Sequence, residues 1–169
     1  MFSMVMEPQG SSPGRSYRYF TGTPLWHFGY GLSYTSFSVD FGGSAPAGPV
    51  PVSNSNLTAA ASFVLKVTNT GPVAGDEVVQ GYYTPNDSSN PLRRQVFAFQ
   101  RVHLAAGESS TVTLSATPMA FVEVDAAGDT YSTPGTFDVL FTNGNDQPTA
   151  TVSAQVQVTG TRRVVATFK

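Results

Sequence analysis

The sequence predicts an all-β protein, an antiparallel β-sandwich of about seven strands, and three observations carry this prediction. The chain of 169 residues holds 20 Val, 19 Thr, 12 Phe and 7 Tyr, but only 8 Leu and no Ile. Such β-branched and aromatic side chains suit a pleated, half-buried sheet. The 16 Gly and 12 Pro are scattered between short apolar runs, as turn residues are. Many of these runs alternate apolar and polar residues with the period of two that a strand requires.

Residues 1–41 contain an unusual concentration of aromatic side chains. Nine of the twenty aromatic residues of the chain lie between positions 17 and 41. At the end of this stretch Phe37, Val39 and Phe41 alternate, which predicts a strand over residues 34–41. Residues 42–56 follow as a low-complexity segment without periodicity, and we expect a mobile loop there.

Beyond residue 60 the strand patterns follow one another regularly, with Gly, Pro, Asn and Asp in the turns between them. Alternation predicts strands at 63–67, 77–83, 95–104, 111–116, 121–124, 136–141 and 151–158. In the run 95–104, Phe97, Phe99 and Arg101 are expected to share one face. Short strands at this spacing predict two sheets with antiparallel pairing.

Charge and length narrow the classes of protein that the sequence can encode. A chain of this length can bury a large core without disulfides or a structural metal. Charged residues make up 12% of the chain and the net charge is −2, so no basic surface for a nucleic-acid partner is expected. The longest apolar runs are a few residues, against the ~20 that cross a bilayer, so no membrane partner is expected either.

The sequence contains partial matches to catalytic and ligand-binding motifs, but none of them is complete. The run Gly10-Ser11-Ser12-Pro13-Gly14 matches G-x-S-x-G, but Pro13 has no N–H for an oxyanion hole and no helix follows, so a flexible turn is expected. The glycines at 29 and 31 lack the third glycine and the strand–helix setting of a dinucleotide loop. His27 and His103 are the only histidines and there is no Cys, so no metal and no cofactor are expected.

The acidic residues form no obvious catalytic pair. A glycosidase needs two carboxylates that face each other across the scissile bond. Asp76 and Glu77 are adjacent, and successive side chains of a strand point to opposite faces. Neither histidine has an obvious carboxylate orienter beside a nucleophile. We therefore nominate no catalytic residue and expect the chain alone to hydrolyse no glycoside.

The aromatic stretch resembles a signature of glycoside hydrolase family 3. The residues that carry the resemblance are Gly14-Arg15-Ser16-Tyr17-Arg18-Tyr19-Phe20 and Pro24-Leu25-Trp26-His27-Phe28-Gly29-Tyr30-Gly31-Leu32-Ser33-Tyr34-Thr35. Further motifs follow in the family's order at 67–71, 74–80, 99–104 and 134–137, so the likeness covers residues 4–158. The sequence departs from the family at His27, Gly81 and Ala98. Gly81 weakens its strand and can mark a bulge.

The resemblance implies a fibronectin type III-like (immunoglobulin-like) sandwich preceded by an extended aromatic connector. Residues 1–33 would then be the remnant of the last strand of an α/β sandwich domain plus the connector. Residues 34–160 would be the fibronectin type III-like domain, and residues 161–169 a C-terminal tail that could add an edge strand. The family's catalytic Asp and Glu belong to regions before this one, so no active-site residue can be carried over.

In function, the resemblance implies a non-catalytic C-terminal module of a β-glucosidase or β-xylosidase. Its partner would be the catalytic domains of the same polypeptide, and its location extracellular, as part of a secreted hydrolase. The chain itself begins without the positive n-region of a signal peptide, while sequons at Asn56 and Asn86 give weak support for secretion. The aromatic residues expected to dock onto those domains are Tyr17, Tyr19, Phe20, Trp26, Phe28, Tyr30 and Tyr34.

Two alternatives stay open. In the first, the chain is a carbohydrate-binding module whose exposed rings stack on a polysaccharide. In the second, it is a free-standing adhesion or structural sandwich, which leaves the connector unexplained. Trp26 and Tyr30 would discriminate between docking and sugar binding. Coplanar, exposed rings favour a sugar, whereas rings in an apolar patch beside residues 1–8 favour a missing domain.

Overall fold

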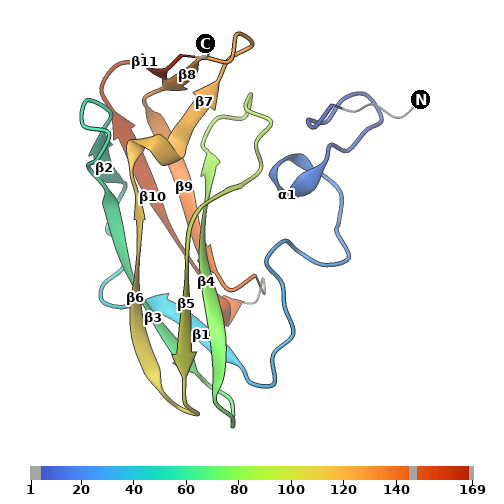
Figure 1. Cartoon of the computed structure of the whole chain (residues 1–169), viewed down its shortest axis with the longest axis vertical. Coiled ribbons are helices and arrows are strands. Elements are labelled where there is room, and N and C mark those ends of the chain that lie inside the picture. The colour runs from blue at the N-terminus through green and yellow to red at the C-terminus, as the bar shows by residue number, and fades with distance from the viewer. Residues whose placement is uncertain (1–4, 145–147, 168–169) are drawn as a thin grey trace.

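The computed structural model describes residues 5–144 and 148–167, and it shows a β-sandwich with the N-terminal segment running along one side (Figure 1). One sheet has three strands in the order β1 (Phe37–Phe41), β3 (Ala61–Asn69), β6 (Ser109–Ala116). The facing sheet has five, in the order β2 (Val50–Ser53), β10 (Thr151–Thr159), β9 (Gly135–Thr142), β4 (Gly75–Pro85), β5 (Gln95–Leu104). The all-β prediction is confirmed.

A third, small sheet lies at one end of the sandwich, where β11 (Arg163–Ala166), β8 (Thr130–Ser132) and β7 (Val122–Val124) pair in that order. Residues of the C-terminal tail form β11, which pairs with β8 at the edge of this sheet. Helical structure in the described residues is limited to α1 (Ser16–Tyr19) and two 3₁₀ turns, Pro118–Phe121 and Pro148–Ala150. None of these helices has the length and apolar character needed to cross a bilayer.

The core lies between the two larger sheets and is built from alternating side chains. In β3 every second residue is buried, from Ala61 to Asn69. From the facing sheet, the Phe141 ring reaches across to Phe63, with ring centroids 4.9 Å apart. This alternation produces the period-two pattern of the sequence because one face of each sheet packs inward while the other meets solvent.

The prediction of a loop over residues 42–56 is wrong in part, because residues 50–53 form β2. This strand pairs with β10 in parallel, with Val50 opposite Val156 and Val52 opposite Val158. The purely antiparallel arrangement is therefore also wrong at this one pair. Val52 is buried in the core, so a segment too short to show a periodic pattern becomes a strand through a partner about a hundred residues away.

Gly81 lies at a β-bulge, as the sequence analysis suggested. The bulge also gives Phe97 a different orientation from the predicted one. Gly81 lies opposite Ala98 but Tyr82 lies opposite Val96, so Phe97 is the extra residue of the bulge. Its ring packs over Gly81, where an added Cβ would be 2.7 Å from Phe97 Cζ. The prediction that Phe97 and Phe99 share a face is wrong, since Phe97 packs against the core and Phe99 is 73% exposed.

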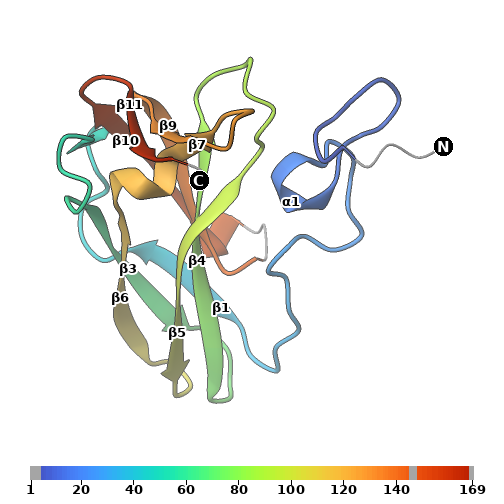
Figure 2. The same cartoon turned by 45° about the horizontal axis from the view of Figure 1, so that its top comes forward.

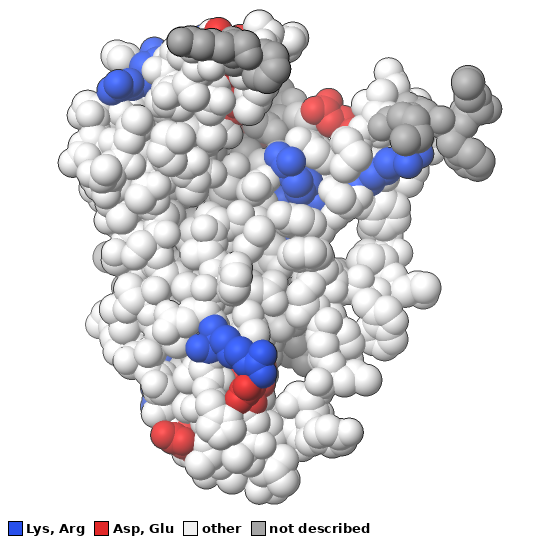
Figure 3. All heavy atoms as spheres, in the orientation of Figure 1, with Lys and Arg blue, Asp and Glu red and all other residues white. Residues whose placement is uncertain are grey.

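The segment before β1 forms a connector, defined here as residues 5–36. Both views show it separated from β3 and β6 and running beside β4, with α1 at its upper end (Figures 1 and 2). Most of the surface in Figure 3 carries neither acidic nor basic side chains, in keeping with a chain of which 12% is charged. The connector and the outer face of the five-stranded sheet together form the candidate functional region.

Candidate functional site along the connector

Tyr82 anchors the connector on the outer face of the five-stranded sheet. This residue is 1% exposed, yet it lies outside the main core cluster. Its ring meets Tyr17 and Phe28 edge-on, and those two rings stack on each other with centroids 4.1 Å apart. Its hydroxyl donates a hydrogen bond to Gln80 Oε1, and the carbonyl of Phe28 lies 3.4 Å from the same hydroxyl oxygen. The connector therefore has a small aromatic core of its own, centred on β4.

Two residues keep the next part of the connector close to the sheet. Gln80 Nε2 donates a hydrogen bond to the carbonyl of Gly29 at 3.4 Å. Gly144, at the end of β9, has φ +80° and lies directly against Gly29, where an added Cβ would be 2.3 Å from the Gly29 carbonyl carbon. A side chain at position 144 would thus occupy the space that the connector fills.

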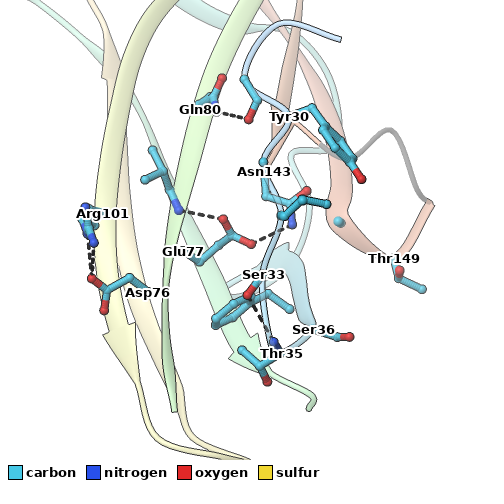
Figure 4. Close-up of a pocket in the computed structure, with 16 residues that line it drawn as sticks. Tyr30, Ser33, Thr35, Ser36, Asp76, Glu77, Gln80, Arg101, Asn143 and Thr149 are labelled. Atoms are coloured by element: carbon cyan, nitrogen blue, oxygen red, sulfur yellow. Dashed lines mark hydrogen bonds and ion pairs between the residues drawn. The ribbon is translucent and has the colours of Figure 1, made fainter. Parts of the chain in front are cut away.

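A cavity of about 570 Å³ lies between this part of the connector and β4, and Figure 4 shows its polar lining. Glu77 points into it, with Oε1 accepting from the Val78 N–H and Oε2 from Asn143 Nδ2, both at 2.8 Å. Burial raises the pKa of the Glu77 carboxyl above its usual value, and the hydrogen bonds from Asn143 and Val78 oppose that rise only in part.

Asp76 points to the opposite face of β4, as the strand pattern predicts (Figure 4). Its two carboxylate oxygens are paired with His103 Nδ1 and with the Arg101 guanidinium. These hydrogen bonds, first from His103 and then from Arg101, lower the pKa of Asp76. The sequence analysis did not anticipate this carboxylate beside a histidine, because only the pairing of β4 with β5 places Asp76 directly opposite His103.

This arrangement does not assemble a hydrolytic centre from the described residues. Asp76 and Glu77 are separated by the sheet, so they cannot face each other across one bond. The His103 imidazole, in the part of the chain described, hydrogen-bonds to Asp76 and to no hydroxyl nucleophile. Likewise, residues 5–144 and 148–167 contain no group of His, Asp or Glu side chains arranged to hold a metal ion.

Glu77 is expected to make stability fall as pH rises. Because its pKa is raised on folding, the folded protein binds this proton more tightly than the unfolded chain, and the free energy of unfolding decreases between the unfolded and the folded pKa. In Glu77→Gln this part of the slope should disappear. In Asn143→Ala, which removes a hydrogen bond that lowers the pKa, the slope should extend to higher pH. Urea unfolding at pH values above and below about 4.5 measures both; an unchanged slope in Glu77→Gln would contradict the assignment.

The seven aromatic residues expected to dock fall into two groups. Tyr17, Tyr19, Phe20 and Tyr30 are half-buried, whereas Trp26, Phe28 and Tyr34 are exposed. Tyr34 is 100% exposed. The sequence analysis missed Leu25 and Leu32, which are 94% and 91% exposed. Their place among the aromatic residues of the connector was the only pattern that could have drawn attention to them.

Trp26 and Tyr30 form neither the coplanar, exposed platform that would favour a sugar nor, among the described residues, an apolar patch beside residues 1–8 that would favour a missing domain. The rings stack on each other, with centroids 4.8 Å and planes 18° apart, instead of lying side by side as one platform. Nor does any residue of the described part of 1–8 line the cleft that contains Trp26. One face of Trp26 is covered by Tyr30, and the residue is 69% exposed.

Comparisons with known proteins identify the domain. Residues 77–144 match the fibronectin type III-like domain. A xylan 1,4-β-xylosidase from Xylanibacter ruminicola is 35% identical over 133 residues, which cover 78% of this chain and 14% of that protein. Among solved structures, a GH3 exo-β-xylosidase with a xylobiose aziridine probe has 25% identity and a TM-score of 0.77, covering 96% of this chain and 22% of its own.

A β-glucosidase from Listeria innocua in complex with glucose has 25% identity and a TM-score of 0.68, over 92% of this chain and 21% of its own. The chain thus spans about a fifth or less of the length of these relatives. The similarity extends over the connector as well as the sandwich, since up to 96% of the chain is covered. Residues 77–144 therefore belong to the fibronectin type III-like domain family, and the chain resembles the region that carries this domain in the β-glucosidases and β-xylosidases of glycoside hydrolase family 3.

Proposed function

We propose that this chain serves as a non-catalytic C-terminal module of a family 3 β-glycosidase and docks onto the catalytic domains through its connector. The observation that carries the proposal is the exposure of Leu25, Leu32 and Tyr34, which are between 91% and 100% exposed. The connector that bears them is held against the sheet by Tyr82 and Gln80, which contact the backbone of Phe28 and Gly29. Three protruding apolar side chains on an anchored segment are typical of a surface that another domain covers.

The proposal assigns hydrolysis to the parts of the parent enzyme outside the matched region. It is supported by the small share of each relative that the chain covers and by the separation of Asp76 from Glu77. We also place the parent enzyme outside the cell. The exposed sequon residues Asn56 and Asn86, both in loops, support this location.

The docking surface is tested by a triple variant, Leu25→Ser, Leu32→Ser and Tyr34→Ser, with Val64→Ser, Met119→Ser and Val164→Ser as the control. All six side chains are exposed, and the three control residues line none of the clefts beside the connector. The variants are tested in a chimera, in which this chain replaces the matched region of the Xylanibacter ruminicola xylosidase. We expect the connector variant to lower the unfolding temperature of the chimera by several degrees, because it removes apolar contacts between domains. The control variant should leave that temperature unchanged.

The isolated chain provides a second readout of the same surface. Without a covering domain it should bind a hydrophobic dye, and the connector variant should bind much less than the control variant. Docking through these three residues is ruled out if all chimeras unfold together and the two variants bind the dye equally.

A further inference from the structure

A second cleft, of about 450 Å³, opens between the connector and the residues that precede β5. Its volume is within the range of small-molecule sites. It shares no residue with the cavity around Glu77, and none of Leu25, Leu32 and Tyr34 lines it. Four aromatic residues and two arginines are among the residues that line it: Tyr17, Phe20, Trp26, Phe28, Arg93 and Arg94.

The aromatic walls of this cleft are held in place yet accessible. Tyr30 stacks on one face of Trp26 but does not line the cleft, whereas Trp26 does line it and is 69% exposed. Phe28, stacked on Tyr17, is 52% exposed. Paired rings of this kind offer a flat, apolar surface at little further cost in side-chain entropy.

The polar side of the cleft is cationic. The backbone of Arg93 is fixed on both sides, with its N–H donating to the Arg18 carbonyl at 2.7 Å and its carbonyl accepting from Thr84 Oγ1 at 2.6 Å. No described residue hydrogen-bonds or pairs with the Arg93 guanidinium. The neighbouring Arg94 lies over the Tyr82 ring, 5.5 Å from its centroid. None of the described residues that line the cleft is acidic, so its two positive charges favour an anion.

A ligand that matches both walls needs an apolar face and a carboxylate. A pyranose presents C–H groups on one face of its ring, which can pack on an indole. A carboxylate accepts two parallel hydrogen bonds from a guanidinium group. A neutral sugar would leave the Arg93 guanidinium without a partner in the cleft, and a simple anion would leave the Trp26 face uncovered.

We propose that the cleft between Trp26 and Arg93 binds a hexuronate, that is, a pyranose that carries a carboxylate. The ring packs on the free face of Trp26, and the carboxylate binds Arg93 with Arg94 beside it. This inference goes beyond the docking role and does not rest on it, because Leu25, Leu32 and Tyr34, on which the docking proposal rests, lie outside the cleft.

Calorimetric titration of the full chain with two closely related ligands tests the proposal. Methyl β-D-glucuronoside should bind at least about 10-fold more tightly than methyl β-D-glucoside, which carries a neutral hydroxymethyl group in place of the carboxylate. Raising the salt concentration from about 0.05 M to about 0.5 M should weaken the glucuronoside several-fold, since the ion pair is partly exposed. Benzoate and acetyl-glutamyl-glycine amide serve as an aromatic anion and an acidic peptide.

Variants of the chain then assign the binding to the two walls. Arg93→Gln should remove the preference for the charged sugar, and Trp26→Ser should weaken both sugars about 10-fold or more. Arg162→Gln is the control, because it also replaces one arginine by glutamine, but beside the C-terminal sheet, where Arg162 lies over the Tyr131 ring. Equal affinity for both glycosides, no binding of either at millimolar concentration, or equal binding of benzoate or the peptide would each overturn the proposal.

Discussion

Replacing Phe141 by alanine is expected to lower the free energy of unfolding by about 3–5 kcal/mol. Phe141 is fully buried on β9, between β10 and β4. Its ring contacts those of Phe41, Phe63 and Phe97, with centroid distances of 6.4, 4.9 and 6.1 Å. Removing it leaves a cavity where both sheets meet, and rings fixed from several sides can collapse into that space only in part. Urea unfolding followed by circular dichroism measures the effect.

Phe99→Ala is the matched control for Phe141→Ala. It removes the same ring from β5, on the other side of β4 in the same sheet, where the side chain is 73% exposed. Its effect should stay within about 0.5 kcal/mol. If Phe141→Ala does not fold, Phe141→Leu retains most of the volume and should be destabilised by a smaller amount. Equal losses in Phe99→Ala and Phe141→Ala would contradict the position of the core.

Gly144→Ala is expected to displace the connector from the sandwich, with a loss of about 2–4 kcal/mol. Two costs combine at this position. The φ of +80° is one that L side chains rarely adopt, and the new Cβ would be 2.3 Å from the backbone of Gly29 and 2.7 Å from the Tyr30 nitrogen. Backbone atoms cannot turn away as a flexible side chain could, so residues 29 and 30 must move. Trp26, the only tryptophan of the chain, reports this movement through its fluorescence.

Gly107→Ala separates the cost of backbone strain from the cost of the clash with residues 29 and 30. Gly107, in the turn between β5 and β6, has φ +75°, but nothing lies within 4 Å of an added Cβ. This variant therefore carries only the backbone strain, about 1–2 kcal/mol, and should leave Trp26 fluorescence unchanged. Faster tryptic cleavage of the connector in Gly144→Ala alone would provide independent support. Similar stability losses in both variants, with no change at Trp26, would show that Gly144 does not hold the connector.

Local patterns in the sequence were enough to predict most strands, because a strand with one buried face must alternate. Ala61, Phe63, Leu65 and Val67 show this alternation, and all four are buried. The bulge at Gly81 and the extra strand of the tail were also predictable. A residue without a side chain weakens a ladder, and a run such as Val164-Val165 can extend one.

Tertiary structure alone decided which segments meet. Val50 and Val52 form a strand only because β10 supplies a parallel partner, and no local pattern records a partner so distant in sequence. The same holds for His103, which meets Asp76 through the register of β4 and β5. Phe97 turns inward because one extra residue at the bulge exchanges the two faces of β5 beyond it.

For the candidate sites, the sequence by itself determined the ingredients: an aromatic connector, two adjacent carboxylates on opposite faces of a strand, and the resemblance to family 3 glycosidases. Only the tertiary structure decided which aromatic rings are buried against Tyr82 and which protrude. It also placed Arg93 beside Trp26, through a backbone hydrogen bond between Arg93 and Arg18. The physical reason is that periodicity encodes the burial of a face, whereas contacts between distant segments depend on the sum of many packing and hydrogen-bond energies across the whole fold.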